Sequence, residues 1–165
     1  MVLTKSELIA SLQHEVHILL HLAGKVDRAK LDFRPTAKQR STLELLKYMS
    51  FMGPVIVTAA KQGTFDPAAW GAEQQKAEAR DFDQTVAAIA AQRDGFASAL
   101  AGWSDADFRV EIEMFGRKTT RGAFLVNTVL GGYAAYRTQL FGYLKLCGRE
   151  ELNTMNLWAG VDGSM

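Results

Sequence analysis

Three histidines are the residues of this sequence best suited to metal chemistry. His14, His17 and His21 fall within LQHEVHILLHL, and their spacings of three and four residues place them along one side of a helix. His17 and His21 could share a metal ion, as the paired histidines of helical zinc motifs do. At about 100° per residue, the stripe lies roughly opposite the main apolar face of this helix. A solvent-facing or subunit-facing stripe and a metal or catalytic site are both open interpretations.

Three tyrosines form a second group of candidates. Tyr133 and Tyr136 are predicted near the inner face of the last helix, and Tyr48 about two turns into the second predicted helix. Buried tyrosines usually pack the ring and hydrogen-bond the hydroxyl. Three of them converging at one end of a bundle would instead line a polar pocket.

Nucleophilic chemistry has little support in the sequence. The single cysteine, Cys147, is predicted in the last turn of a helix, where the negative end of the helix dipole opposes thiolate formation. We therefore expect it to be a packing residue. The chain contains neither a G-x-S-x-G elbow nor a P-loop, and no G-x-G-x-x-G follows a predicted strand. No residue is assigned a catalytic role.

Composition narrows the class of protein. The 165 residues are 48% hydrophobic and 22% charged with a net charge of +1, which is typical of one globular domain and gives no electrostatic support for nucleic-acid binding. One cysteine excludes an internal disulfide and fits a reducing compartment. The N-terminus turns polar too early for a signal peptide, and no apolar run reaches the ~20 residues that span a bilayer. We expect a cytoplasmic protein that does not enter membranes.

Helical periodicity appears in four stretches, residues 4–26, 41–62, 83–101 and 120–147. The second opens with the capping-box pattern of Ser41 and Glu44, and Gly53-Pro54 within it predicts a kink. The polar connection over residues 61–83 is expected to be a functional loop or a strap across the bundle. Alternating residues over 109–120 predict a short extended piece or hairpin.

These elements predict one all-α domain over residues 1–165. Helices joined by mostly short links form a four-helix bundle, with a long connection between helices 2 and 3 and a short extended segment before helix 4. The core spans about residues 5–148. The tail, residues 149–165, is too short for a domain, and Leu157 and Trp158 suggest that it docks on the bundle.

Two segments resemble a known family. LDFRPTAKQRSTLELLKYMS, residues 31–50, is similar to the junction of helices 1 and 2 in the DinB-like superfamily, and FGRKTTRGAFLVNTVLGGYAAYRTQLFGYLKLCG, residues 115–148, to its fourth helix. The resemblance covers about residues 5–148 and implies a bacterial four-helix bundle, commonly a homodimer. Many members hold a divalent metal with three histidines. Some are metal-dependent thiol transferases, and others are grouped with metal-dependent hydrolases.

The three family ligands do not carry over to this sequence. The positions that the resemblance assigns to histidines hold Tyr48, Gly132 and Tyr136. Glycine has no side chain to offer, and a phenol with an ordinary pKa near 10 is a poor substitute for imidazole at neutral pH. The sequence therefore predicts a vacated metal site. We expect Gly132 to make room there for the ring of Tyr48 or Tyr136.

Three hypotheses follow. The first is a metal-free homodimeric bundle that binds a small ligand or is structural, with Tyr48, Gly132, Tyr133 and Tyr136 at the old site. The second is an enzyme of the thiol-transferase or hydrolase kind with nickel, zinc or iron at a relocated site on His17 and His21. The third is an interaction module whose histidine stripe contacts a partner or a second copy.

Overall fold

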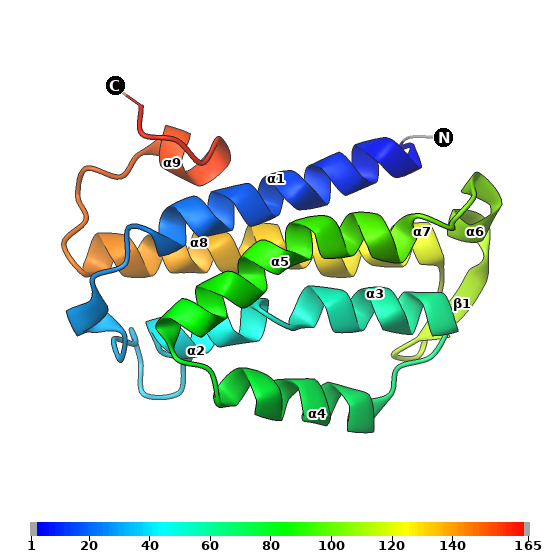
Figure 1. Ribbon diagram of the computed structural model, residues 1–165, viewed down its shortest axis with the longest axis horizontal. Coiled ribbons are helices and arrows are strands. Elements are labelled where there is room, and N and C mark those ends of the chain that lie inside the picture. Colours follow the sequence, from blue (N-terminus) through cyan, green and yellow to red (C-terminus); the bar gives the residue numbers. More distant parts are fainter. Residues whose placement is uncertain (1–2, 164–165) are drawn as a thin grey trace.

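Four long helical rods run side by side in the computed structural model, which describes residues 3–163 (Figure 1). The rods are α1 (Lys5–Ala23); α2 (Thr42–Met49) with α3 (Met52–Gln62); α5 (Phe82–Leu100); and α7 (Arg121–Phe124) with the π-helical η2 (Leu125–Leu130) and α8 (Gly131–Leu146). The shorter elements are η1 (Arg28–Lys30), α4 (Pro67–Glu78), α6 (Asp105–Arg109), the antiparallel strands β1 (Glu111–Met114) and β2 (Arg117–Thr120), and α9 (Thr154–Trp158). The predicted all-α bundle is confirmed.

The first rod is shorter than its periodicity predicts. It begins at the capping box of Thr4 and Glu7 but ends at Ala23 rather than near Val26. After Ala23 the backbone tightens, because the amides of Lys25 and Val26 bond to carbonyls three residues back, at 3.0 and 3.1 Å. Apolar residues continue past this point, so periodicity alone overestimates the helix.

The second rod is broken earlier than the predicted kink. The helix stops at Met49 and restarts at Met52, so that Ser50 and Phe51 form the break and Gly53-Pro54 lies in the first turn of α3. Pro54 lacks the amide hydrogen that would bond to the carbonyl of Ser50 in a continuous helix. In the first turn of a new helix that hydrogen has no partner to lose. The proline thus interrupts the helix about one turn before its own position, at Ser50 and Phe51.

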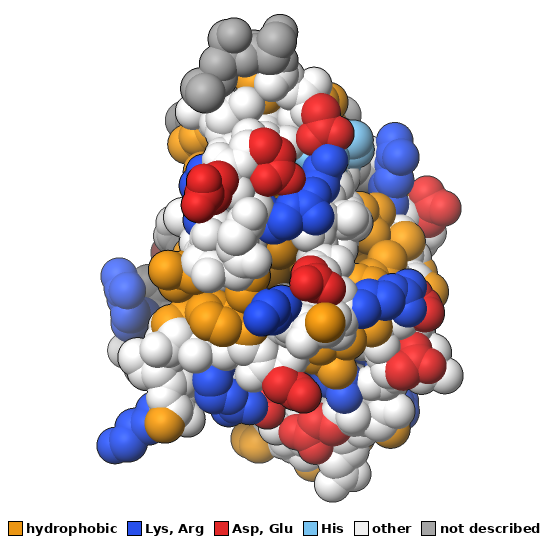
Figure 2. Space-filling model, turned by 90° about the vertical axis from the view of Figure 1, so that its left-hand side faces the viewer, with side chains coloured by type: hydrophobic (Ala, Val, Ile, Leu, Met, Phe, Trp, Pro, Cys, Tyr) orange, Lys and Arg blue, Asp and Glu red, His pale blue; other side chains and the backbone are white. Residues whose placement is uncertain are grey.

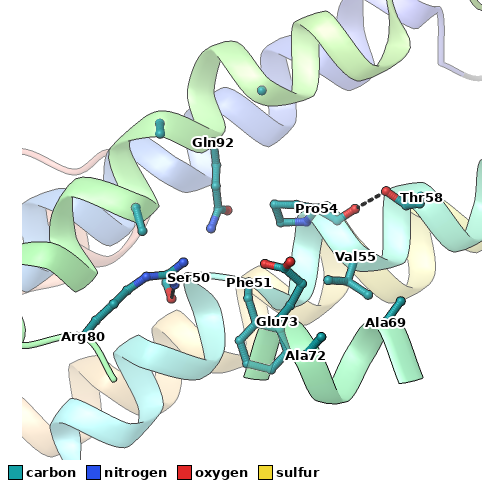
Figure 3. A pocket seen from close by; sticks show the side chains of 13 residues that line it. Ser50, Phe51, Pro54, Val55, Thr58, Ala69, Ala72, Glu73, Arg80 and Gln92 are labelled. Atoms are coloured by element: carbon teal, nitrogen blue, oxygen red, sulfur yellow. Dashed lines mark hydrogen bonds between the residues drawn. The ribbon is translucent and has the colours of Figure 1, made fainter. Parts of the chain in front are cut away.

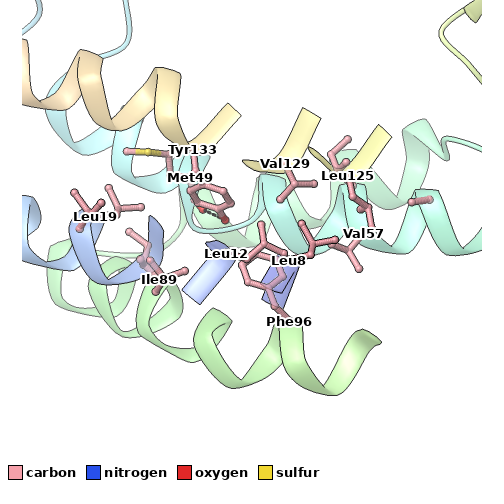
Figure 4. Packing of buried hydrophobic residues seen from close by; sticks show 14 of the residues in the cluster. Leu8, Leu12, Leu19, Met49, Val57, Ile89, Phe96, Leu125, Val129 and Tyr133 are labelled. Atoms are coloured by element: carbon pink, nitrogen blue, oxygen red, sulfur yellow. Dashed lines mark hydrogen bonds between the residues drawn. The ribbon is translucent and has the colours of Figure 1, made fainter. Parts of the chain in front are cut away.

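Buried side chains from all four rods form the core (Figure 4). Two polar side chains lie among them at the level of the break. Gln92 donates through Nε2 to the carbonyl oxygen of Met49 at 2.9 Å, and the Tyr133 hydroxyl lies 3.2 Å from the same oxygen. Tyr133 also donates to Gln92 Oε1. These contacts satisfy a carbonyl that the broken helix leaves without its own partner.

One helical stretch, Thr42–Gln62, is long and apolar enough by composition to cross a membrane. However, 61% of its most apolar window is buried inside the bundle. Its apolar residues are therefore accounted for by core packing. At the end of the molecule that Figure 2 shows, basic and acidic side chains are interspersed around hydrophobic ones, so this face carries no patch of a single charge sign.

Candidate functional site

Tyr48 and Tyr136 meet at the interface of α2 and α8. Tyr48 lies in the last turn of α2 and Tyr136 in the second turn of α8, which α2 packs against. Their ring centroids are 5.0 Å apart and the rings are inclined by 69°, an edge-to-face arrangement. Both side chains are half-buried. Two of the three positions that the resemblance assigns to metal ligands are thus occupied by rings packed on each other.

The electrostatics of this pair oppose metal binding. Burial, followed by the neighbouring Tyr136 hydroxyl, raises the pKa of Tyr48 to about 12. The guanidinium of Arg40, 4.0 Å from the Tyr48 ring centroid, acts in the opposite direction but is a smaller cause. A phenol binds a cation well only as phenolate, and Tyr48 remains neutral through the physiological range. With Gly132 at the third position, the residues present do not fit the family's metal.

The expected role of Gly132 is corrected by the structure. A Cβ atom on Gly132 would meet the terminal methyl of Met52 at 3.0 Å, so a methionine and not a tyrosine ring fills the space beside it. Close glycine–tyrosine packing occurs instead at Gly53, where a Cβ would lie 2.4 Å from Tyr133 Oη. Tyr133 is fully buried and its hydroxyl donates to Gln92 Oε1. Of the four predicted pocket residues, Tyr48 and Tyr136 thus contact each other, whereas Gly132 lies against Met52 and Tyr133 bonds to Gln92.

A cavity of about 440 Å³ opens on the outer side of Tyr48, between α2 and α4. We call it the Tyr48 pocket. Its aromatic wall consists of Tyr48, Phe51 and Trp70, with ring centroids 4.9–6.0 Å apart. Charged groups of both signs also line it, namely Arg40, Glu44, Lys47 and Glu78. Its size falls within the range of small-ligand sites.

The C-terminal segment lies over the histidine stripe. His14 Nε2 is 3.0 Å from the carbonyl oxygen of Trp158, and His21 Nε2 is 3.0 Å from Asn156 Nδ2. A Cβ on Gly160 would lie 2.7 Å from His17 Cδ2. The stripe does lie off the core, since His14 and His17 are exposed. The chain's own tail nevertheless covers part of a face that was expected to meet solvent or a partner.

Within residues 3–163, no group of three or more histidine, cysteine or acidic side chains is arranged to hold a metal ion.

The tail differs from expectation in its contacts. Asn156 is buried, whereas Trp158 is 63% exposed and has the Arg137 guanidinium 5.1 Å from its ring centroid. Cys147 is half-buried, and burial raises the pKa of its thiol, which favours the packing interpretation.

A buried ion pair between α1 and α8 was not predicted from the sequence. Arg137 Nε donates to Glu15 Oε2 at 2.5 Å, and the two side chains are only 5% and 10% exposed. Arg137 also donates to the carbonyl oxygen of Leu157. Glu15 lies between the apolar positions Leu12 and Leu19, and a charge at such a place was the available signal. The pair joins α1, α8 and the tail.

Comparison with known proteins identifies the fold. No family model matches the chain, and no curated protein matches it. Among solved structures, it is similar to the crystal structure of YjoA, a DinB-like protein from Bacillus subtilis, with a TM-score of 0.68 and 18% sequence identity. The match covers 88% of this chain and 94% of that one. The chain therefore has the four-helix-bundle fold of a DinB-like protein.

Proposed function

We propose that the chain is a DinB-like superfamily protein that works without the family's three-histidine metal centre and binds a small molecule in the Tyr48 pocket. The observation that supports this proposal is the packing at the positions that the resemblance assigns to the metal ligands. Tyr48 and Tyr136 stack edge to face, and Met52 fills the space beside Gly132. Side chains that pack on one another have replaced side chains that would coordinate a metal.

The Tyr48 pocket offers two kinds of contact to a ligand. Its aromatic wall suits a flat or apolar body, since such surfaces gain both area burial and ring stacking. Arg40, Lys47, Glu44 and Glu78 provide charged and hydrogen-bonding groups around it. The Lys47 ammonium donates to the carbonyl of Glu78 at 2.8 Å, which ties α2 to the end of α4 and holds this side of the pocket together.

Metal binding tests the first half of the proposal. The tag-free protein is titrated with nickel, zinc and iron and compared with the Tyr48→His/Gly132→His/Tyr136→His variant. We expect no stoichiometric binding by the original chain, and one equivalent once imidazoles return, because the atom nearest to a Cβ at position 132 is the flexible end of Met52. One tightly held equivalent in the original chain would overturn the proposal.

Indole, a flat neutral probe, tests the second half. Its binding is followed by amide chemical shifts, which we expect to change along α2 and α4. Trp70→Leu should weaken binding because it removes part of the aromatic wall. Trp158→Leu is the matched control, since Trp158 is exposed on the tail, outside this pocket. Equal affinity in the two variants, or absence of binding, would contradict a ligand site beside Tyr48.

Two further parts of the proposal concern assembly and the alternative site. A cytoplasmic homodimer is the proposed state, checked by sedimentation of the tag-free protein. The alternative enzyme with a relocated metal would use His17 and His21. If the original chain binds a metal and His17→Ala/His21→Ala loses it, this alternative replaces the metal-free proposal.

A further inference from the structure

A second cavity of about 540 Å³ lies on the other side of α4, between α3, α4 and α5 (Figure 3). We call it the α5 cleft. Small residues face it from both flanking helices at helical spacing: Ala69 and Ala72 from α4, and Ala88, Ala91 and Gly95 from α5. α4 packs on α2 and α3. Short side chains on the facing surfaces of α4 and α5 leave the intervening volume open.

Arg80 supplies a fixed positive group to the α5 cleft. Its Nη1 donates to Ser50 Oγ at 2.7 Å, and the Ser50 hydroxyl itself donates to the carbonyl of Lys47 at 2.7 Å. Ser50 is buried at the helix break, so it holds the guanidinium in place. In the described part of the chain, no carboxylate lies within ion-pair distance of Arg80. A guanidinium has five donors in a planar fork that matches a carboxylate.

Glu73 supplies a negative group to the same cleft. It lies within α4, whereas Arg80 follows the end of this helix. Figure 3 shows its carboxylate extending toward the space between Phe51 and Pro54. Glu73 Oε1 lies 2.6 Å from Lys76 Nζ, and the side chains of Lys76 and Glu73 are 65% and 37% exposed, respectively. Such a surface pair is weak and can yield to a ligand ammonium.

One wall of the α5 cleft is apolar. Phe51, Pro54 and Val55 line it from the break and first turn of α3. Gln92 also borders the cleft, but its amide is already bound to the Met49 carbonyl and to the Tyr133 hydroxyl. The α5 cleft thus presents a guanidinium, an apolar wall and a carboxylate. A metal would find only one carboxylate here, beside a cation.

We propose that the α5 cleft binds a small zwitterion with an apolar middle, its carboxylate on Arg80 and its ammonium facing Glu73. The carboxylate and ammonium of such a molecule are opposite in charge to Arg80 and Glu73, and its apolar part suits the wall of the cleft. The α5 cleft is distinct from the Tyr48 pocket, although Phe51 borders both. The inference therefore goes beyond the proposed function and does not depend on whether the old metal site is vacated.

Three probes of matched length test the assignment. Labelled full-length protein is titrated with 6-aminohexanoate, hexanoate and hexylammonium, and amide chemical shifts locate the binding. We expect shifts centred on Ala88, Ala91 and Gly95, with affinity falling from 6-aminohexanoate to hexanoate to hexylammonium. Absence of binding by all three, shifts confined to the Tyr48 pocket, or tightest binding of hexylammonium would overturn the proposal.

Substitutions assign the two charged ends. Arg80→Met should weaken 6-aminohexanoate and hexanoate by roughly ten- to a hundred-fold, as expected for loss of charge-assisted hydrogen bonds, and leave hexylammonium little changed. Arg93→Met is the control, because Arg93 is an exposed arginine on α5 that does not line the cleft. Glu73→Gln should weaken 6-aminohexanoate but not hexanoate. Equal affinities in Arg80→Met and Arg93→Met would refute the role of Arg80.

A second variant covers the case in which Arg80→Met does not fold. Ala91→Leu adds volume at an exposed position that lines the cleft. It should abolish binding of 6-aminohexanoate while the fold is retained, as judged by the dispersion of the amide spectrum. Undiminished binding in this variant would show that the probe lies elsewhere.

Discussion

Two segments cross the bundle on opposite sides, and they pack in different ways (Figure 1). On one side, α4 buries only Ala77 along its length and is bordered by two cavities. On the other, the tail buries Leu152, Asn156 and Gly160 and binds α1 and α8 through its polar atoms. The tail is therefore packed against the core. α4 instead borders open cavities, and the guanidinium of Arg80 beside it has no carboxylate partner among the described residues.

The largest effect is expected where the tail joins the core. Arg137→Met leaves Glu15 buried without its partner and removes the donor to the Leu157 carbonyl. The free energy of unfolding in urea should fall by about 3–5 kcal/mol. Glu15→Met/Arg137→Met is the matched control and should be closer to the original chain, since no unpaired charge remains. Equal loss in the single and double variants would indicate that packing, not charge, sets the cost.

A smaller loss is expected at Gly160, where the tail meets His17. Gly160 has a φ of +66°, and a Cβ there would lie 2.7 Å from His17 Cδ2. Gly148 has a φ of +95° but nothing within 4 Å of its Cβ position. Gly160→Ala should therefore cost about 1–3 kcal/mol more than Gly148→Ala, from overpacking alone. If urea denaturation shows equal losses, the tail does not pack on α1 as described.

The same type of substitution should have the opposite sign in α4. Gly71 lies within this helix, and a Cβ there would meet nothing within 4 Å. Gly71→Ala should stabilise α4 by up to about 1 kcal/mol, because alanine costs less backbone entropy in a helix. Slower amide exchange across α4 would show this gain. Faster exchange would mean that the added methyl group clashes with a neighbouring residue. α4 would then be packed as tightly as the tail, and the contrast between the two segments would fail.

The fold could be predicted from local signals. The Ser41–Glu44 capping box forms as expected, and the four periodic stretches became the four rods. α4 was predicted only as a polar connection, because its alanine-rich surface has no apolar stripe. Asp66 before Pro67 is nevertheless an N-cap signature that indicates a helix start, and the Asp66 carboxylate does cap α4.

The arrangement of the candidate residues could be predicted only in part. The sequence places Tyr48 and Tyr136 on neighbouring helices, and the two rings do meet. That Met52 rather than a tyrosine lies against Gly132 depends on where the second rod breaks. The pairing of Glu15 with Arg137 joins residues 122 positions apart. Contacts of that range come from tertiary packing, which periodicity does not encode.

The smallest expected effect is a pH dependence of stability in the tail that α4 does not share. His21 Nε2 accepts from Asn156, and only a neutral nitrogen can accept. Burial, followed by the nearby Lys25 charge, lowers the pKa of His21 from 6.5, although Asp162 acts in the opposite direction. Between the lowered and ordinary pKa values the unfolded chain binds more protons than the folded one, so stability falls as the pH drops below about 6.5.

Amide exchange measures this effect in each segment separately. The tail should become less protected on mild acidification, while α4, which contains no histidine, should not change. His21→Gln retains a side chain that can accept from Asn156 but does not titrate, so it should remove the pH dependence of the tail. If α4 and the tail lose protection together, or if His21→Gln behaves as the original chain does, the tail is not held through a neutral His21. Acidification would then destabilise the whole bundle, and pH would not distinguish the packed tail from α4.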